Sequence, residues 1–210
     1  MADEGIIVST SYLPTIGYIS ALLKAREIVI ELDETYIKQT CRNHANIYGP
    51  NGIQTISIPV NKPGGNHTKT RDIRISYALP WHKTHRRTIE AAYNNSPFFL
   101  YYEHYFIPFF EKEYEFLVDL NSEILETLFR LLQVSKEIRF TGTYIKKPEG
   151  MRDLRRELTA KHATAICPLY TQTFAEKHGF ISNLSIIDLL FNVGPETTEY
   201  LHSMPAISLL

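Results

Sequence analysis

Gly5-Ile6-Ile7-Val8-Ser9-Thr10 is the stretch that decides the fold, because this short β-branched run ends in hydroxyl residues and predicts a buried first strand. From Ile16 to Arg26 the apolar residues fall at helical spacing, and Glu27 to Leu32 returns to strand character. Strand, helix and strand in this order predict a βαβ unit with a right-handed crossover. A parallel sheet that begins in this way places ligands at the carboxyl ends of its strands.

Beyond this unit the sequence predicts an α/β fold with a mixed, partly parallel sheet, flanking helices and a largely helical second half. The alternating runs Ile56 to Val60 and Ile73 to Tyr77 predict an antiparallel pair, joined by a mobile loop from Asn61 to Thr70. Gly49-Pro50-Asn51-Gly52 predicts a turn.

The second half shows mainly helical spacing. We expect helices over 84–93, 97–105, 108–117, 119–132 and 151–158, with a strand over 137–141. A helix that carries Tyr170 is expected to end at Gly179. The next helix, capped by Ser182 or Asn183, is expected to end at Gly194.

The composition is that of a globular protein, and we expect one domain over residues 1–210. Hydrophobic residues make up 44% and charged residues 21%, which is enough for a packed core. Lys and Arg total 22 against 23 Asp and Glu, so a formal charge of −1 gives no general attraction for nucleic acid or anionic membrane. Two cysteines and the lack of a signal-like N-terminus predict a cytoplasmic protein, and no apolar run approaches the ~18 residues of a membrane helix.

A polar run from Thr35 to His44 directly follows the second predicted strand. It is expected to emerge at the same sheet edge as Ser9 to Pro14, so that the two segments face one crevice. Lys38 would supply a point charge and Arg42 a bidentate fork for a phosphate or carboxylate; the alternative is a solvated loop with ordinary charges. Cys41 is expected to be a packed thiol rather than a nucleophile.

Several sequence blocks occur in order over nearly the whole chain. They are Tyr12-Leu13-Pro14, Gly17-Tyr18, Lys38-Gln39, Arg42-Asn43, Gly49-Pro50-Asn51-Gly52, Pro80-Trp81, His85-Arg86, Tyr93, Ser96-Pro97-Phe98-Phe99 and His178 to Asn192. Together these blocks resemble the WbqC-like protein family, which is found in bacteria and is in some cases associated with surface-polysaccharide gene clusters. Two departures are visible: Ser9-Thr10-Ser11 stands where many members carry His-Gln-Pro, and His44 stands where they carry an arginine.

Histidines offer the first candidates for chemistry. His85 is a candidate acid or base, because imidazole titrates near neutral pH, and the alternative is a structural histidine. His82 and His85 lie three residues apart, but no carboxylate or thiol stands at a supporting distance in the sequence. We therefore expect no metal and no other cofactor.

Aromatic and helix-start residues complete the set of candidates. An aromatic wall for a sugar ring or a nucleobase could be formed by Trp81, Tyr93, Phe98 and Phe99, with core packing as the alternative. Asn183, Ser185 and Asp188 lie around one helix start, where they would bind an anion or hydroxyl or simply cap the helix.

The sequence contains no Walker loop, GxGxxG, GxSxG or HExxH motif, so the common functions of those motifs are not indicated. The polar sheet edge, together with the context that the resemblance implies, leads to the hypothesis of a cytoplasmic group-transfer enzyme that acts on a sugar or nucleotide-activated precursor of a surface polysaccharide. In this hypothesis His85 and Asp188 are catalytic, and the substrate, small and anionic or sugar-containing, is bound by Tyr12, Lys38, Arg42, Asn43, Trp81, Tyr93, Asn183 and Ser185.

The alternative is a non-catalytic binding or scaffold protein that recognises an anionic metabolite or a partner protein with the same residues. A deep pocket that joins Tyr12, Lys38, Arg42, His85 and Asn183 would favour catalysis, whereas a flat surface over them would favour the scaffold.

Overall fold

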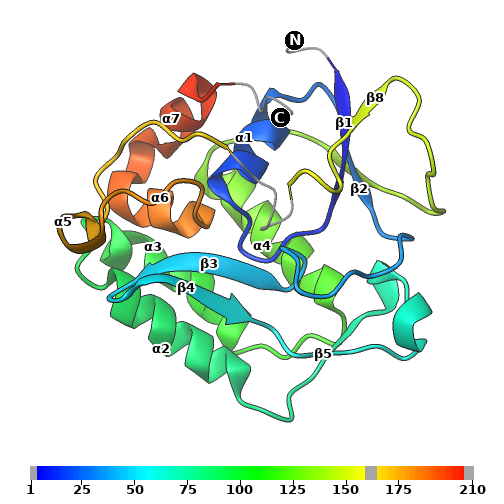
Figure 1. Cartoon of the computed structure of the whole chain (residues 1–210), viewed down its shortest axis with the longest axis horizontal. Helices are drawn as coiled ribbons and strands as arrows, with labels where there is room; N and C mark the ends of the chain where they lie inside the picture. Colours follow the sequence, from blue (N-terminus) through cyan, green and yellow to red (C-terminus); the bar gives the residue numbers. More distant parts are fainter. Residues whose placement is uncertain (1–3, 159–164, 206–210) are drawn as a thin grey trace.

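The computed structural model describes residues 4–158 and 165–205 of the chain. A parallel sheet is formed by β1 (Gly5–Ser9), β2 (Ile28–Glu31), β7 (Ile138–Phe140) and β8 (Met151–Asp153), in the order β7-β2-β1-β8. In Figure 1, β1, β2 and β8 lie toward one side of the molecule. Every residue of β1 and β2 is buried, as expected for parallel strands that are covered on both faces. The predicted α/β class is confirmed, and so is the opening βαβ unit.

Helix α1 (Ile16–Lys24) makes the crossover between β1 and β2. It begins where the Thr15 hydroxyl accepts a hydrogen bond from the backbone N–H of Tyr18 at 3.2 Å, which satisfies one of the free donors of the first turn. Its predicted apolar stripe is buried and packs against α6 (Ile186–Val193) and α7 (Thr197–Ser203). This packing brings α6 and α7, which lie late in the sequence, against the helix that connects β1 to β2.

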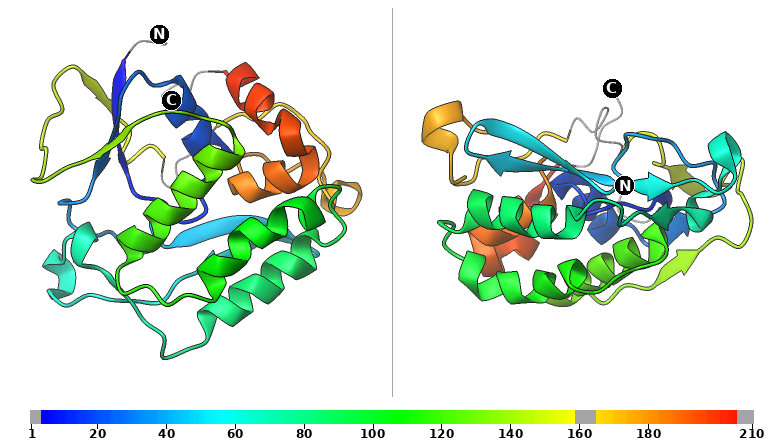
Figure 2. Two further views of the ribbon diagram at one scale, coloured as in Figure 1. Left: turned by 180° about the vertical axis from the view of Figure 1, so that it is seen from behind. Right: turned by 90° about the horizontal axis from the view of Figure 1, so that it is seen from below.

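A hairpin of β3 (His44–Gly49) and β4 (Gly52–Ser57) lies outside the parallel sheet. Its turn falls at the predicted place, and Gly52 has a φ of +99°, a conformation that favours glycine. Strand β3 packs against both α2 (Trp81–Tyr93) and α6. Seen from below in Figure 2, the hairpin lies on one side of the molecule and α4 (Leu117–Leu131) on the other.

The predicted antiparallel pair is confirmed only in part. β5 (Val60–Asn61) pairs with β6 (Arg74–Ile75), but Ile56 belongs to the hairpin strand β4, whose partner β3 was not predicted. The connection between β5 and β6 contains two short 3₁₀ turns, η1 (Gly65–His67) and η2 (Thr70–Asp72), and is tied to the segment after β2 by a bridge between Thr35 and Lys69.

The remaining elements are mostly helical. They are α3 (Phe99–Phe106), the 3₁₀ turn η3 (Ile107–Phe110), α5 (Ala175–His178) and the 3₁₀ turn η4 (Gly194–Glu196). The core is continuous, because buried apolar side chains of the sheet, the hairpin and the helices form one cluster.

Four local predictions were wrong. Tyr170 was expected to lie on a helix, but the helix that ends at Gly179 as predicted is only α5, which begins at Ala175. Residues 151–158 were expected to form a helix, but Met151–Asp153 is the edge strand β8, whose open side tolerates charged residues such as Arg152. Residues 108–117 contain only the 3₁₀ turn η3, and α4 then begins at Leu117. The cap of α6 is Ser185 rather than Ser182 or Asn183.

Candidate functional site

Arg42 lies at the carboxyl edge of the sheet, as predicted, but its side chain is only 1% exposed. Its Nε and Nη2 atoms donate to Glu34 Oε1 at 2.9 and 2.6 Å, Nη2 also donates to Ser9 Oγ at 2.7 Å, and Nη1 donates to Thr40 Oγ1 at 3.0 Å. The guanidinium is therefore used to join the end of β1 to the segment that follows β2.

Glu31, at the end of β2, is fully buried and accepts hydrogen bonds on both carboxylate oxygens. Oε1 accepts from the Thr141 hydroxyl at 2.6 Å and the Asp33 backbone N–H at 2.9 Å. Oε2 accepts from the Ile145 backbone N–H at 2.9 Å and from Arg155 Nη1 at 3.4 Å. This carboxylate connects the loop after β7 to the centre of the sheet.

Asp33 completes the pattern at this edge. Its carboxylate accepts from Lys69 Nζ at 2.7 Å and from the Arg71 guanidinium, which also donates to the Thr141 carbonyl at 2.8 Å. We call these residues the edge network: Glu31, Asp33, Glu34, Arg42, Lys69, Arg71 and Arg155. Each of its carboxylates has a cationic partner within the network, so these charges are already paired in the folded protein.

A groove of about 540 Å³ opens beside this network. One wall is formed by residues of the segment 36–44 and the other by residues 57–62, with Gly65 and Asn66 at the end. Among the described residues that line it none is acidic, whereas Lys38, His44 and Lys62 are basic. We call it the lysine groove. Its excess of positive charge distinguishes it from the edge network.

The two lysines lie close together at one end of this groove. Lys62 Nζ donates to Asn66 Oδ1 at 2.9 Å, and loss of hydration together with the neighbouring Lys38 ammonium lowers the pKa of Lys62. Neither lysine has an acidic partner within 4 Å among the residues that the structure describes. Two adjacent ammonium groups without a counter-charge are suited to an anion.

The hairpin forms the other end of the groove. His44 and Ser57 are a cross-strand pair of β3 and β4, and His44 Nε2 lies 3.2 Å from Ser57 Oγ. Partial burial lowers the pKa of His44, so its imidazole is neutral at pH 7. This end therefore offers neutral hydrogen-bonding groups rather than charge.

Two buried polar atoms lie in the groove wall without a hydrogen-bond partner among the described residues. They are the Tyr36 hydroxyl and Asn43 Oδ1, whereas Asn43 Nδ2 donates to the Ile58 carbonyl at 2.8 Å. Burial raises the pKa of Tyr36, so its phenol remains protonated. Buried polar atoms normally have a partner, and exceptions gather at functional sites.

His85 lies behind the hairpin wall and not in the groove. Its Nδ1 is 3.0 Å from the Tyr12 hydroxyl, and the polar backbone of Ser57 raises the pKa of the ring slightly against the effect of burial. The Trp81 ring packs edge-on against it, with centroids 5.1 Å apart. Burial lowers the pKa of His85 to about 4. The imidazole is neutral, enclosed and held by its hydrogen bond with Tyr12.

Asp188 lies in the first turn of α6 and is fully buried, and its Oδ2 accepts from the Tyr170 hydroxyl at 2.5 Å and Gln172 Nε2 at 3.0 Å. Burial raises its pKa, against the hydrogen bonds, which lower it. Tyr93 is close to this carboxylate, and its hydroxyl accepts from the Tyr48 backbone N–H at 3.1 Å. Among the described residues Asp188 has no cation within 4 Å.

Asn183 and Ser185 connect the start of α6 to the region of α1. Asn183 Oδ1 accepts from the Gly17 backbone N–H at 2.8 Å, and Ser185 Oγ donates to the Leu13 carbonyl at 2.9 Å. A Cβ at Gly17 would lie 2.6 Å from the Ala165 Cβ and 3.0 Å from Asn183 Oδ1, so the close packing here favours glycine. Both side chains therefore bond to the backbone of the segment 13–17, and their role is structural.

The predicted site residues thus fall into separate groups. Lys38 and Asn43 line the lysine groove, Arg42 lies in the edge network, and Tyr12 and Trp81 surround His85. Within the described chain, no single pocket joins these groups. Lys62 and Ser57 were not predicted as site residues; the strand alternation around 56–60 is the one local signal near them, and it does not indicate a groove.

Other features of the described chain add little to this site. Cys41 is buried, and burial raises the pKa of its thiol, in agreement with a packed cysteine. Among residues 4–158 and 165–205, no group of three or more His, Cys, Asp or Glu is placed to hold a metal ion. No helix in these ranges has the length and apolar character needed to cross a membrane.

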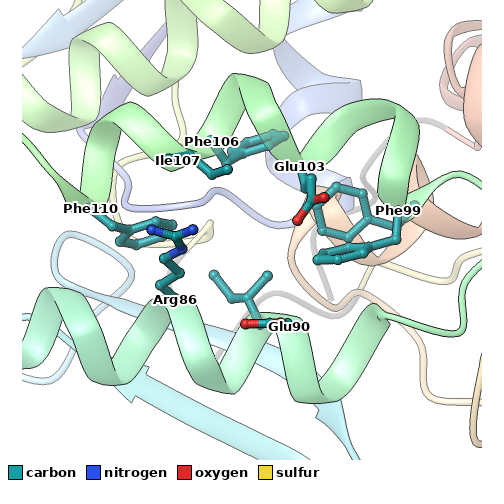
Figure 3. A pocket seen from close by; sticks show the side chains of 9 residues that line it. Arg86, Glu90, Phe99, Glu103, Phe106, Ile107 and Phe110 are labelled. Atoms are coloured by element: carbon teal, nitrogen blue, oxygen red, sulfur yellow. The ribbon is translucent and has the colours of Figure 1, made fainter.

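A smaller cavity of about 60 Å³ lies between α2 and α3 (Figure 3). Phe99, Phe106 and Phe110 give it apolar walls, and Arg86 at its rim bonds to Glu111 at 3.1 Å. Its size is close to that of one or two water molecules, so it cannot accommodate a sugar.

The fold and its site define an α/β protein with an open, basic groove beside the carboxyl edge of a parallel sheet. The chain belongs to the WbqC-like protein family, whose model matches residues 10–167 and 159–200. It is 28% identical over 222 residues to the uncharacterized protein Rv1507c of Mycobacterium tuberculosis, an alignment that covers 93% of this chain and 96% of that protein. No solved structure matches the chain. The family predicted from the sequence blocks is confirmed.

Proposed function

We propose that this protein binds a small anionic metabolite in the lysine groove, of the class of a sugar or nucleotide-activated precursor of a surface polysaccharide. The observation that carries the proposal is the pair Lys38 and Lys62, which lie side by side without an acidic partner among the described residues. A bound phosphate or carboxylate relieves the repulsion between the two ammonium groups and adds charge-assisted hydrogen bonds. The volume of about 540 Å³ is within the range of small-molecule sites.

Binding is the part of the function that the geometry supports best. His85 and Asp188, the two candidate catalytic groups, are enclosed and do not line the groove. Of Tyr12, Lys38, Arg42, His85 and Asn183, only Lys38 lines the groove, so these residues do not form the deep shared pocket that would favour catalysis. In this proposal the protein binds its ligand in the cytoplasm.

Group transfer is the second candidate function, and the His44–Ser57 pair favours it. A neutral imidazole 3.2 Å from a hydroxyl is the arrangement of a base next to a nucleophile. The pair lines the same groove as the lysines, so a ligand held there would be within its reach.

The proposal is tested by isothermal titration with inorganic phosphate, UDP and UDP-glucose on the full chain. We expect binding that weakens with added salt, and a loss of about tenfold in affinity in Lys62→Gln or Lys38→Gln, because a charge-assisted hydrogen bond contributes roughly 1.5 kcal/mol. Lys83→Gln, which removes an exposed lysine of α2 outside the groove, is the matched control. Equal losses in the control and the groove variants, or no binding of any anion, would contradict the proposal.

A further inference from the structure

The lysine groove has two ends with different chemistry. Lys38, Lys62 and Asn66 form a charged end, and His44 and Ser57 form a neutral end on the hairpin. The wall from Ser57 to Lys62 spans at most about 17 Å of chain, so the two ends are within the length of one small molecule. A ligand that uses both ends carries an anionic group on one side and neutral polar groups on the other.

The neutral end offers hydrogen-bond acceptors and donors that match hydroxyl groups. With His44 neutral, its Nε2 can accept from the Ser57 hydroxyl, which leaves the lone pairs of Ser57 Oγ for a donor on the ligand. Asn43 Oδ1, buried in the same wall, has unused acceptor capacity among the described residues. A hydroxyl group both donates and accepts, as this set of groups requires.

The groove has no platform for a nucleobase. Besides the His44 imidazole, Tyr36 is the one aromatic residue among the described lining residues, and its ring is buried. Proteins that hold bases without reading their edges do so mainly by stacking them on exposed aromatic faces. A base would therefore find hydrogen bonds in this groove but no stacking partner.

From this arrangement we infer that the ligand is a phosphate monoester of a polyhydroxy compound, a sugar phosphate, bound with its phosphate at Lys38 and Lys62 and its hydroxyls at His44 and Ser57. The inference rests on the proposed anion-binding function and adds the ligand class and the direction of binding. The phosphate interacts with both ammonium groups, and the sugar ring lies along the wall from Lys62 toward the hairpin.

The test compares four probes by isothermal titration on the full chain: glucose 1-phosphate, inorganic phosphate, glucose and UMP. We expect glucose 1-phosphate to bind at least tenfold more tightly than phosphate, UMP to bind no more tightly than phosphate, and glucose alone to give no measurable heat. Ser57→Ala is expected to lower the affinity for glucose 1-phosphate about fivefold and to leave phosphate binding unchanged, because one neutral hydrogen bond is lost.

Thr55→Ala is the matched control for Ser57→Ala. Thr55 lies two residues from Ser57 on the same face of β4. Its hydroxyl donates to Oδ1 of Asn46 on the paired strand β3 at 2.7 Å, but Thr55 and Asn46 do not line the groove. This variant should change no affinity. Because Thr55 and Ser57 are both exposed, both variants are expected to fold, and a thermal denaturation scan checks this.

The outcomes separate the two proposals. If phosphate and glucose 1-phosphate bind equally, or if Ser57→Ala weakens both to the same extent, the inferred direction is wrong while anion binding stands. Tighter binding of UMP than of glucose 1-phosphate also overturns the inference in favour of a nucleotide. If no phosphate-bearing probe binds, the proposed function fails as well.

Discussion

The edge network and the lysine groove are neighbours, but the charged residues that the structure describes there differ: those of the network are paired, and those of the groove are not. In the edge network Glu31, Asp33 and Glu34 each have a cationic partner, and the Arg42 guanidinium is almost fully buried. In the lysine groove Lys38 and Lys62 are adjacent and have no acidic partner among the described residues. Charge that is paired and buried supports the fold, whereas charge that is unpaired and accessible is available to a ligand.

This difference changes how the polar run 35–44 is interpreted. Its most ligand-like residue by chemistry, Arg42, is committed to Glu34 and Ser9. Its Lys38 remains accessible because it projects to the groove rather than to the sheet edge. Residue type alone therefore does not locate a binding site; the partners of each charge do.

The largest expected effect comes from breaking the edge network at Arg42. Arg42→Met leaves the Glu34 carboxylate buried without its partner, which costs about 3–5 kcal/mol in the free energy of unfolding. The double variant Arg42→Met/Glu34→Met removes both charges and should recover most of this loss. Urea denaturation measures both. A single variant within about 1 kcal/mol of the original protein would show that the pair has no structural role.

The next effect is a pH dependence at His85, which stands behind the hairpin wall of the groove. Its folded-state pKa of about 4 is below its ordinary 6.5, so the unfolded chain binds the proton first as pH falls. Stability should be fully present above pH 6.5 and fall by roughly 3 kcal/mol as pH drops toward 4.

The variant His85→Gln should lack this part of the pH dependence while keeping the slopes due to the other groups. Urea denaturation at a series of pH values, compared between the two proteins, isolates the histidine. Parallel curves from pH 7 to pH 4 would mean that His85 is already exposed to solvent in the folded protein.

A smaller effect is expected at Asp188, a buried carboxylate that has hydrogen bonds but no nearby cation among the described residues. Its raised folded-state pKa means that the folded protein binds the proton first, so this group makes stability fall as pH rises above its unfolded value near 3.9. Asp188→Asn keeps an oxygen for Tyr170 and removes the charge, and should lie within about 1 kcal/mol of the original protein at pH 7.

Asp188→Ala is the contrast, because it leaves Tyr170 and Gln172 without their acceptor and should cost roughly 2 kcal/mol. Thermal denaturation at pH 7 ranks the two variants. If Asp188→Asn is as damaging as Asp188→Ala, the negative charge itself is required, and Asp188 resembles the edge network rather than a neutral hydrogen-bonding group.

Much of the fold could be predicted from the sequence, because β1, α1 and β2 carry strong local patterns. The hairpin strand β3 was missed, since its residues follow a polar run and pack against α2 and α6, which are distant in the sequence. β8 was mistaken for a helix because a three-residue edge strand is too short to show alternation.

The candidate site was predictable only in part. Lys38 and Asn43 were selected from the polar run, and both line the groove. Lys62 could not be selected, because its position next to Lys38 depends on the pairing of β5 with β6 and on the bridge between Thr35 and Lys69. The burial of Arg42 depends on its ion pair with Glu34, and this pairing is set by the tertiary fold rather than by the local sequence.

The smallest effect gives the most direct test of the comparison, because it sets one lysine of each region against the other. Lys69→Gln removes a cation that bonds to the buried Asp33 at 2.7 Å, so we expect a modest fall in the melting temperature, limited because Arg71 also pairs with Asp33. Lys62→Gln removes a cation that is repelled by the Lys38 ammonium, so we expect an unchanged or slightly higher melting temperature. Added phosphate should raise the melting temperature of the original protein and of Lys69→Gln more than that of Lys62→Gln, since binding to the folded state stabilises it. Equal shifts in all three proteins would place the anion somewhere other than the lysine groove.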